Sequence, residues 1–323
     1  MAKDKLKNTL TVAFYNVENL FDTIKDPHKD DGDFTPIGRF KWNKSKYRQK
    51  LRKITSVLSM IGEHESYNGP AIIGLVEVEN PKVLNDLIMH KNLIKHNYRF
   101  IHYDSPDERG IDVALLYNPS LFTVLSSESV YVGITDEDGS TDYTRDILVV
   151  KGILNNDLVY VIVNHWPSRA EGEKESEYKR VNAAKVVSDT IERIKKEERH
   201  EPKFIVMGDF NDNPSSMSID NYLVDDTLFN PMKALHKKNN GTLTYYGEWH
   251  LFDQIILSKN FFDESSSLRF VEAKIFKKPW MRVYKGKLKG SPFRTFIGPW
   301  YEGGFSDHFP VYLKLKKKKA SYQ

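Results

Sequence analysis

Phe204-Ile205-Val206-Met207-Gly208-Asp209-Phe210-Asn211-Asp212-Asn213-Pro214 is the stretch of sequence that decides the fold. Its first four residues form a wholly apolar run between Pro202 and Gly208, which is typical of a strand buried on both faces. Four polar residues then follow within five positions. An α/β protein usually presents its chemistry where polar side chains crowd the end of a buried strand. An Asx-rich turn that only caps the backbone is the structural alternative.

The same pattern recurs along the chain, because other apolar runs also begin or end beside polar residues. These runs lie at 10–15, 71–76, 158–163, 251–257 and 311–315. The polar residues beside all the runs are, in chain order, Asn16, Glu77, His165, Asp209 with Asn211, Asp253, and Asp307 with His308. This recurrence favours a functional interpretation of the first stretch over a simple turn.

Segments with helical periodicity lie between the runs. Apolar residues from 47 to 61 have the spacing of an amphipathic helix, for which Asn43 or Ser45 is the N-cap candidate. Pro81 begins a second helix, and residues 181–194 carry a third. Two further strands, 147–154 and 158–163, are expected to form a hairpin. The acidic segments 22–36 and 131–143 are expected to be loops.

The length of 323 residues would by itself allow two domains. No linker rich in Gly, Ser or Pro divides the chain, and the polar strand ends extend from Asn16 to His308. We therefore expect a single domain over residues 8–316 and a basic tail over 317–323. The net charge is only +4, and because much of it lies at this lysine-rich end, it says little about a polyanionic partner.

The chain contains no cysteine, which excludes disulfides, thiolate metal sites and a cysteine nucleophile. Residues 1–7 lack the apolar stretch of a signal peptide, and no apolar run approaches the ~20 residues that span a bilayer. These features predict a cytoplasmic protein without a membrane span, and we expect it to be a monomer. A secreted chain trimmed of its signal peptide would look the same.

The polar residues at the strand ends suit one kind of chemistry. The sequence has no Gly-x-Ser-x-Gly elbow, no phosphate-binding glycine-rich loop with lysine, and no His-Glu-x-x-His zinc motif. It offers carboxylates and an amide for a hard divalent ion, together with two histidines. Mg²⁺ prefers one or two carboxylates and shares its substrate's phosphate oxygens, and histidine titrates near neutral pH. This inventory predicts Mg²⁺-assisted hydrolysis of a phosphate ester, with Mn²⁺ able to substitute.

Asp253 needs a partner because it stands inside an apolar run. A buried carboxylate is costly unless a cation or a hydrogen-bond donor is paired with it. His308 is the natural candidate, and the two residues would form an Asp–His dyad. Taken singly, a histidine at a strand end is more often a structural residue.

Six motifs carry a resemblance to a known family. They are Phe-Tyr-Asn16-Val, Leu-Val-Glu77-Val, Asn-His165-Trp-Pro-Ser-Arg, Gly-Asp209-Phe-Asn211, the strand acid Asp253, and Ser-Asp307-His308-Phe-Pro-Val. In this order they resemble the endonuclease/exonuclease/phosphatase superfamily, to which DNase I and the exonuclease III-type repair nucleases belong. Single motifs such as Gly-Asp-Phe-Asn are weak, but the ordered set covers nearly the whole chain. The resemblance implies an α/β fold that is a four-layer α/β/β/α sandwich, in which two mixed sheets pack face to face between helices.

The resemblance implies that Asn16, Glu77 and Asp307 surround the metal. Glu18 lies two residues after Asn16, so both side chains face the same side of a strand. Repair-type members have an acid at that place, which makes Glu18 a candidate further ligand. Glu79 would face as Glu77 does if the strand continues, but Glu77 is the residue that matches the motif.

The remaining motif residues take catalytic roles under the same resemblance. Asp209, helped by Asn211, would orient or deprotonate the attacking water. His308, held by Asp253, would contact the scissile phosphate. His165 would act as an acid, a base or a phosphate ligand.

Two supporting roles and two departures complete the resemblance. Arg145 lies where relatives often have an arginine that positions phosphate, and Asp112 is the candidate to fix the tautomer of His165. Val76 stands where relatives often carry Gln, and Phe252-Asp253-Gln254 replaces a frequent Tyr-Asp-Arg. The nucleic-acid contacts that those residues make in relatives cannot be carried over to this chain.

Three functions compete. The first is a Mg²⁺-dependent phosphodiesterase or nuclease, and the second is a phosphatase acting on a small or lipid-linked phosphoester. A binding module that has lost catalysis is disfavoured, because both histidines and every core carboxylate are retained.

The segment 277–294 carries seven bases and no acid, with three aromatic residues interleaved. It could stack bases along a nucleic-acid backbone or form a solvated loop, so the substrate stays open.

Overall fold

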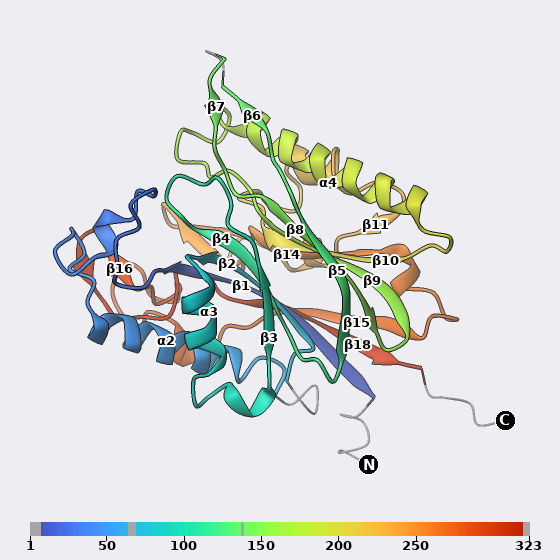
Figure 1. Ribbon diagram of the computed structural model, residues 1–323, viewed down its shortest axis with the longest axis horizontal. Helices are drawn as coiled ribbons and strands as arrows, with labels where there is room; N and C mark the ends of the chain where they lie inside the picture. The colour runs from blue at the N-terminus through green and yellow to red at the C-terminus, as the bar shows by residue number, and fades with distance from the viewer. Residues whose placement is uncertain (1–7, 64–68, 137–138, 319–323) are drawn as a thin grey trace.

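Two six-stranded sheets pack face to face at the centre of the molecule (Figure 1). The computed structural model describes residues 8–63, 69–136 and 139–318. The first sheet contains, in spatial order, β15 (Leu268–Ile275), β18 (Val311–Lys317), β1 (Thr9–Leu20), β2 (Ile72–Val78), β4 (Asp112–Tyr117) and β3 (Arg99–His102). The second contains β11 (Leu228–Phe229), β14 (Asp253–Ser258), β10 (Lys203–Asp209), β9 (Asp157–His165), β8 (Ile147–Leu154) and β5 (Phe122–Val130). Both sheets are mixed, as the resemblance implied.

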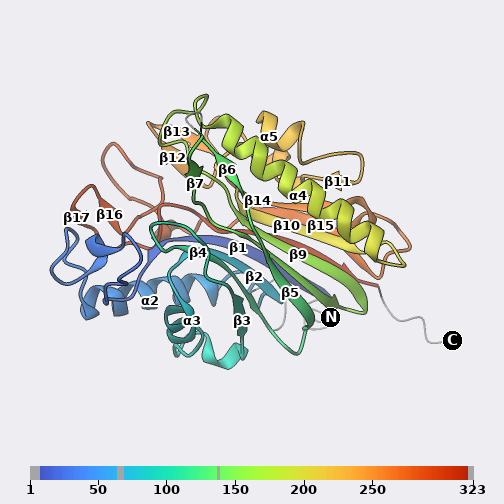
Figure 2. The same ribbon diagram turned by 45° about the horizontal axis from the view of Figure 1, so that its top comes forward.

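Helices cover the outer face of each sheet, which completes the four layers of the predicted α/β/β/α sandwich (Figure 2). The first sheet is covered by α2 (Lys44–Leu58) and α3 (Pro81–Ile88), and the second by α4 (Glu177–Glu197) and the short α5 (Met217–Asp220). Asn43 is the N-cap of α2, because its side chain accepts hydrogen bonds from the backbone N–H groups of Ser45 and Lys46. No helix within the described ranges is long and apolar enough to cross a membrane.

Short elements connect the layers. The small hairpins pair β6 (Ile134–Thr135) with β7 (Thr141–Asp142), β12 (Leu243–Tyr245) with β13 (Glu248–His250), and β16 (Phe296–Ile297) with β17 (Trp300–Tyr301). The 3₁₀-helices are η1 (Gly32–Phe34), η2 (Ile94–His96), η3 (Pro231–Leu235), η4 (Lys259–Phe261) and η5 (Pro279–Met281).

Strands of the two sheets bury both of their faces, which explains the continuous apolar runs of the sequence. One face of β1 places Phe14 in the layer between the sheets, together with Met207 and Ile255 from the second sheet. The other face of β1 places Tyr15 against the helices α2 and α3, where Leu51 packs. These residues are at most 6% exposed. Alternate side chains of one strand thus belong to two apolar layers, one between the two sheets and one between the first sheet and its helices.

Strand direction brings the polar strand ends to one end of the sandwich. β1 runs parallel to β2 and antiparallel to β18, so the ends of β1 and β2 lie beside the start of β18. In the second sheet, Asp209 at the end of β10 stands in register with His165 on one side and Asp253 on the other. Both sheets therefore present their polar residues at the same end of the sandwich.

The structure differs from the expected elements in several places. Strand β1 continues past Asn16 to Leu20, and the segment 131–143 contains the β6–β7 hairpin. Strand β5 was not predicted, since its sequence FTVLSSESV is half polar and lies at the edge of its sheet. Of the expected tail, Lys317 is the last residue of β18, and residues 319–323 lie outside the described residues.

Gly208 should be intolerant of any side chain. A Cβ atom there would lie 2.7 Å from the Cβ of Asn164 on the parallel strand β9, and closer still to its carbonyl oxygen. Because backbone cannot move aside as a flexible side chain can, Gly208→Ala should lower the free energy of unfolding by about 1–3 kcal/mol. Denaturant unfolding measures this change. Gly32→Ala is the control, because its Cβ would meet only the Lys25 side chain at 3.7 Å; equal stability of the two variants would contradict the prediction.

Candidate active site

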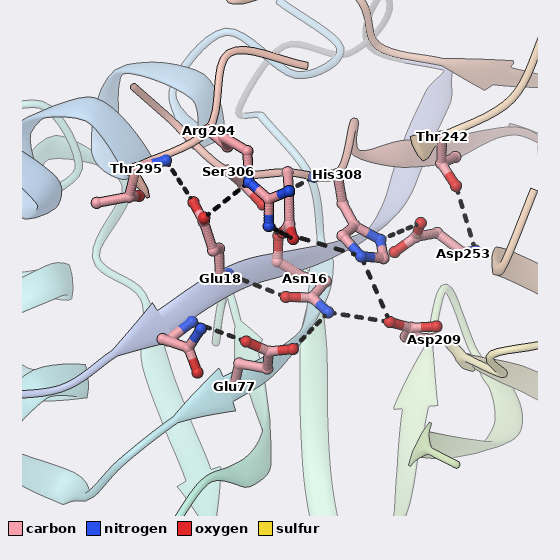
Figure 3. Close-up of polar contacts among 12 residues, drawn as sticks. Asn16, Glu18, Glu77, Asp209, Thr242, Asp253, Arg294, Thr295, Ser306 and His308 are labelled. Atoms are coloured by element: carbon pink, nitrogen blue, oxygen red, sulfur yellow. Dashed lines mark hydrogen bonds and ion pairs between the residues drawn. The ribbon is translucent and has the colours of Figure 1, made fainter. Parts of the chain in front are cut away.

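The polar residues at the strand ends converge where the two sheets meet (Figure 3). Asn16 is fully buried, and its Nδ2 donates to Glu77 Oε1 at 3.1 Å and to Asp209 Oδ2 at 2.9 Å. Its Oδ1 accepts from the backbone N–H of Glu18 at 2.9 Å. Since Asp209 belongs to the second sheet, the Asn16 amide ties the two sheets together at the site.

Left-handed backbone turns the acids toward this centre. Glu18 and Asn19 have φ values of 52° and 51°, and Glu77 has a φ of 64°. The β1–β2 register shifts between Asn16 and Leu20, so both strands are irregular there. The bulge lets the Asn19 N–H donate to Glu77 Oε2 at 2.8 Å. Non-glycine residues in this region cost free energy and persist where the surroundings hold them, often at functional sites.

Asp253 and His308 form the dyad that the apolar run suggested. His308 Nδ1 lies 2.7 Å from Asp253 Oδ2, and the Asp253 side chain is fully buried. Ser306 fixes the loop, because its hydroxyl donates to the Asn16 carbonyl and accepts from the His308 N–H. Burial alone would lower the pKa of His308, but the carboxylates of Asp253 and Asp209 outweigh it and raise that pKa well above its usual range.

Asp209 lies between the two histidines. Its Oδ2 is 3.8 Å from His308 Nε2 and 3.9 Å from His165 Nε2, while its Oδ1 accepts from the Asn211 N–H. Burial raises the pKa of Asp209 to about 6, against the opposing effect of His308. Asn211 itself has a φ of 49° and donates its side-chain amide to the Trp166 carbonyl at 2.9 Å.

His165 is buried, and its charged form is disfavoured. Its Nε2 lies 3.9 Å from Glu77 Oε1. Burial, followed by the positive charge of Arg145, lowers the pKa of His165 well below its usual range. Its Nδ1 is buried without a hydrogen-bond partner in the part of the chain that the structure describes.

Asp112 is not the partner of His165 in the structure. Its carboxylate lies 3.1 Å from His102 Nε2 and accepts from the Ser105 backbone and hydroxyl. The physical reason is its position at the start of β4, where β3 is the neighbouring strand of the first sheet. The predicted contact that would fix the His165 tautomer is therefore absent among the described residues.

Arg145 lies behind the site and is mostly engaged. Its guanidinium donates to Asp107 at 3.1 Å and to the Trp166 carbonyl at 3.0 Å, and the side chain is only 8% exposed. It supports the same backbone carbonyl that binds Asn211. Glu79 also points elsewhere, because it accepts from the Asp22 N–H, and burial raises its pKa to about 8.

Two cationic residues that were not part of the motifs also belong to the site. Lys50 of α2 is only 1% exposed, and its Nζ contacts Thr295 Oγ1 at 2.6 Å, the Phe305 carbonyl at 2.9 Å and Glu18 Oε2 at 3.4 Å. The sequence position of Lys50 could have indicated its burial, since Lys50 falls on the apolar stripe of the helix between Tyr47 and Ile54. A lysine on a buried helix face needs acceptors.

Arg294, from the basic segment 277–294, is the second cation. Its Nη2 lies 2.8 Å from Asp307 Oδ2. Its Nε lies 3.6 Å from Glu18 Oε1 (Figure 3). Asp307 is also influenced by its neighbours, because His308 and then Arg294 outweigh burial and lower its pKa. Part of the basic segment therefore belongs to the site rather than to a solvated loop.

The carboxylates differ in their access to a metal ion. The side chains of Glu77 and Asp307 are 14% and 28% exposed, whereas those of Asp209 and Glu18 are 3% and 6% exposed. A hydrated hard cation needs reachable oxygen ligands, so Glu77 and Asp307 fit it best. Ligand atoms of Asp209, Asp253 and His308 also lie within 4.8 Å of one another. The site therefore contains groups that could hold a metal.

Comparison with known proteins gives the family and the fold of the chain. A model of the "Endonuclease/Exonuclease/phosphatase family" matches residues 11–317. The structure of D. rerio TDP2 complexed with single-strand DNA product superposes with a TM-score of 0.60 at 15% identity, covering 96% of this chain and 100% of that one. A family protein from Bacteroides thetaiotaomicron superposes with 0.60 at 17% identity, covering 96% and 98%.

A mannosyl-6-phosphatase from Bacteroides thetaiotaomicron VPI-5482 has a TM-score of 0.57 at 17% identity, with 95% and 99% of the two chains covered. At these identities the likeness to solved structures shows the fold. No curated protein sequence matches this chain.

Lys50 should be essential for stability. Lys50→Met would leave the buried Glu18 carboxylate without its ammonium partner, and breaking a buried ion pair from one side costs about 3–5 kcal/mol. The free energy of unfolding measures the loss. Arg48→Met, on an exposed position of the same helix, is the matched control. Adding Glu18→Gln to Lys50→Met should restore part of the stability, and a further additive loss in the double variant would contradict the pairing.

Proposed function

The chain belongs to the endonuclease/exonuclease/phosphatase family and is a hydrolase of phosphoesters, and from this premise we propose that it is a Mg²⁺-dependent phosphodiesterase. One observation carries the proposal. His308 is held by the buried Asp253 at 2.7 Å, and its Nε2 faces Asp209 Oδ2 at 3.8 Å, beside the two most accessible carboxylates of the site. Such a cluster joins a base, an anion-stabilising group and metal ligands in one place.

Each residue has a role in the proposed reaction. Asp209 accepts a proton from the attacking water, because its pKa of about 6 leaves it ionised yet basic at neutral pH. Asn211 holds the same carboxylate through its backbone N–H. His308 remains protonated and donates to a phosphate oxygen as negative charge develops there. His165, whose lowered pKa favours the neutral imidazole, donates its ring N–H to a phosphate oxygen on the other side of Asp209.

The metal would be held by Glu77 and Asp307. Asn16 orients Glu77, and its Oδ1 retains a second lone pair beside the Glu18 N–H. When bound, Mg²⁺ supplies charge neutralisation of phosphate oxygens. Arg294 neutralises Asp307 in part, and its half-exposed guanidinium is also able to contact a phosphate. Arg145 supports the site from behind in this scheme, since its two terminal nitrogens donate to Asp107 and to the Trp166 carbonyl.

The organisation of the chain is part of the proposal. We propose one catalytic domain over residues 8–316, working as a monomer. Support comes from the pairing of β18 with β1, which joins the two ends of this range in the middle of one sheet. A phosphatase acting on a small or lipid-linked phosphoester remains the second candidate, because the solved structures with this fold include both a DNA-bound TDP2 and a mannosyl-6-phosphatase.

Metal removal tests the proposal directly. EDTA should abolish the hydrolysis of bis-p-nitrophenyl phosphate, and Mg²⁺ or Mn²⁺ should restore it, because an ion held by Glu77 and Asp307 would neutralise charge on the phosphate oxygens. Parallel assays with single-stranded DNA, RNA, p-nitrophenyl phosphate and inositol phosphates assign the substrate. Faster turnover of the monoesters would favour the phosphatase, and full activity after exhaustive chelation would overturn the metal mechanism.

Substitutions of Asp209 and Asp212, which lie in the same turn, should distinguish a loss of turnover from a loss of stability. Asp209→Asn keeps the shape and one of the two acceptor oxygens but removes the base, so turnover should fall at least ~10²-fold, with a smaller change in stability from the lost acceptor. Asp212 is buried and paired with Arg169 and Arg180, so Asp212→Asn should reduce stability and leave the turnover of folded protein nearly intact. Near-normal turnover of Asp209→Asn would return this residue to a capping role, in which Asp and Asn are equivalent.

A further inference from the structure

We propose that a pocket of aromatic side chains beside the catalytic cluster binds the base of a nucleotide whose phosphate lies in the site. The inference rests on the proposed function and narrows its substrate class to nucleotide phosphoesters. No sequence motif marks this pocket, because its lining comes from three separate segments of the chain, 18–19, 34–40 and 294–298.

The pocket has a volume of about 140 Å³. Phe34, Phe40 and Phe296 form its apolar wall, and Glu18, Asn19 and Arg294 supply polar atoms. Ring centroids lie 4.9 Å apart for Phe34 and Phe40, and 4.5 Å apart for Phe40 and Phe296. Because Phe34 and Phe40 are only half-buried, both keep ring surface for a ligand.

The wall is supported from behind. Phe34 stacks on Phe21 at 4.4 Å, and the indole of Trp42 approaches both Phe34 and Phe296. Trp42 is itself fully buried, and its Nε1 donates to the Phe21 carbonyl at 3.0 Å. The pocket is therefore held in shape before any ligand arrives, which reduces the entropic cost of binding.

Shared residues connect the pocket to the reaction centre. Glu18 lies two residues after Asn16, and Arg294 contacts both Glu18 and Asp307. The Asn19 N–H donates to Glu77, the proposed metal ligand. A substrate with its phosphate at Glu77, Asp307 and His308 would thus place an adjoining group against Arg294 and into the pocket.

The size and lining select that group. An apolar cavity of about 150 Å³ is large enough to bind benzene, so this pocket takes one ring rather than a lipid chain. A phosphorylated sugar would lose hydrogen bonds from its hydroxyl groups against three phenyl walls. A nucleobase offers flat faces for stacking on the phenyl rings and polar edges for the side-chain amide of Asn19. It therefore matches both the apolar and the polar part of the lining.

A binding experiment tests the pocket apart from catalysis. Thymidine 5′-monophosphate and base-free 2-deoxyribose 5-phosphate are titrated by calorimetry, with Mg²⁺, into protein carrying Asp209→Asn to slow turnover. We expect the nucleotide to bind at least about tenfold more tightly than the sugar phosphate, because stacking of one base contributes roughly this much. Equal affinity for the two ligands would overturn the inference.

Variants then locate the stacking surface. Phe40→Ala should remove most of the preference for the nucleotide and leave the affinity for the sugar phosphate unchanged. Phe40→Leu keeps apolar bulk without a ring and should give an intermediate loss, which covers the case of a misfolded alanine variant. Trp300→Ala is the control, since Trp300 is 73% exposed on the β16–β17 hairpin and does not line the pocket. Equal losses for both ligands, or a similar loss with Trp300→Ala, would overturn the assignment.

The outcomes separate this inference from the proposed function. Metal-dependent hydrolysis of bis-p-nitrophenyl phosphate by the unaltered protein, without preference for the nucleotide in the titrations, would refute the pocket and keep the phosphodiesterase. A Phe40-dependent preference without any hydrolysis would keep the pocket and refute the catalytic proposal.

Discussion

Close packing of the two sheets is the constraint on which the site depends. Phe14 and Met207 come from opposite sheets and share one apolar layer. The approach is close enough that a Cβ on Gly74 would lie 2.5 Å from the sulfur of Met207. The sheets therefore meet without room for water, and their polar ends are held at a fixed separation. The hydrogen bond from Asn16 to Asp209 spans this junction at 2.9 Å. The packing of the two sheets therefore sets the distances between the polar residues of the site.

Charge balance is the second consequence of that packing. The junction gathers the carboxylates of Glu18, Glu77, Asp209, Asp253 and Asp307, against the cations Lys50, Arg294 and protonated His308. If all were ionised, five acids against three cations would leave an excess of two negative charges. Removing so many charges from water is costly, and a divalent ion at the two most accessible acids would neutralise the excess. The carboxylates of Asp253 and Asp209 raise the pKa of His308 against the effect of burial, whereas burial is the main cause of the raised pKa of Asp209.

The sequence predicted the fold class and most of the residues that meet at the site, because both depend on continuous apolar runs and on the polar residues beside each run. Runs such as 204–207 are buried on both faces and could be recognised locally. Strand β5 could not, since an edge strand with one solvated face carries no continuous apolar run. Lys50, Arg294 and the true partners of Asp112 are set by which elements become neighbours, and that information is absent from local spacing. The left-handed backbone at Glu77 is equally invisible, because no glycine marks it.

The placement of β18 has a consequence for biosynthesis. This strand pairs with β1 in the middle of the first sheet, although the two stand at opposite ends of the described chain. Asp307 and His308 immediately precede it. During translation β1 is made long before β18 and must wait, with one edge unpaired, until that strand has also left the ribosome. A polypeptide that stops before residue 307 thus lacks His308 of the dyad, the Asp307 carboxylate and a central strand together, so the candidate site cannot assemble until β18 has been made.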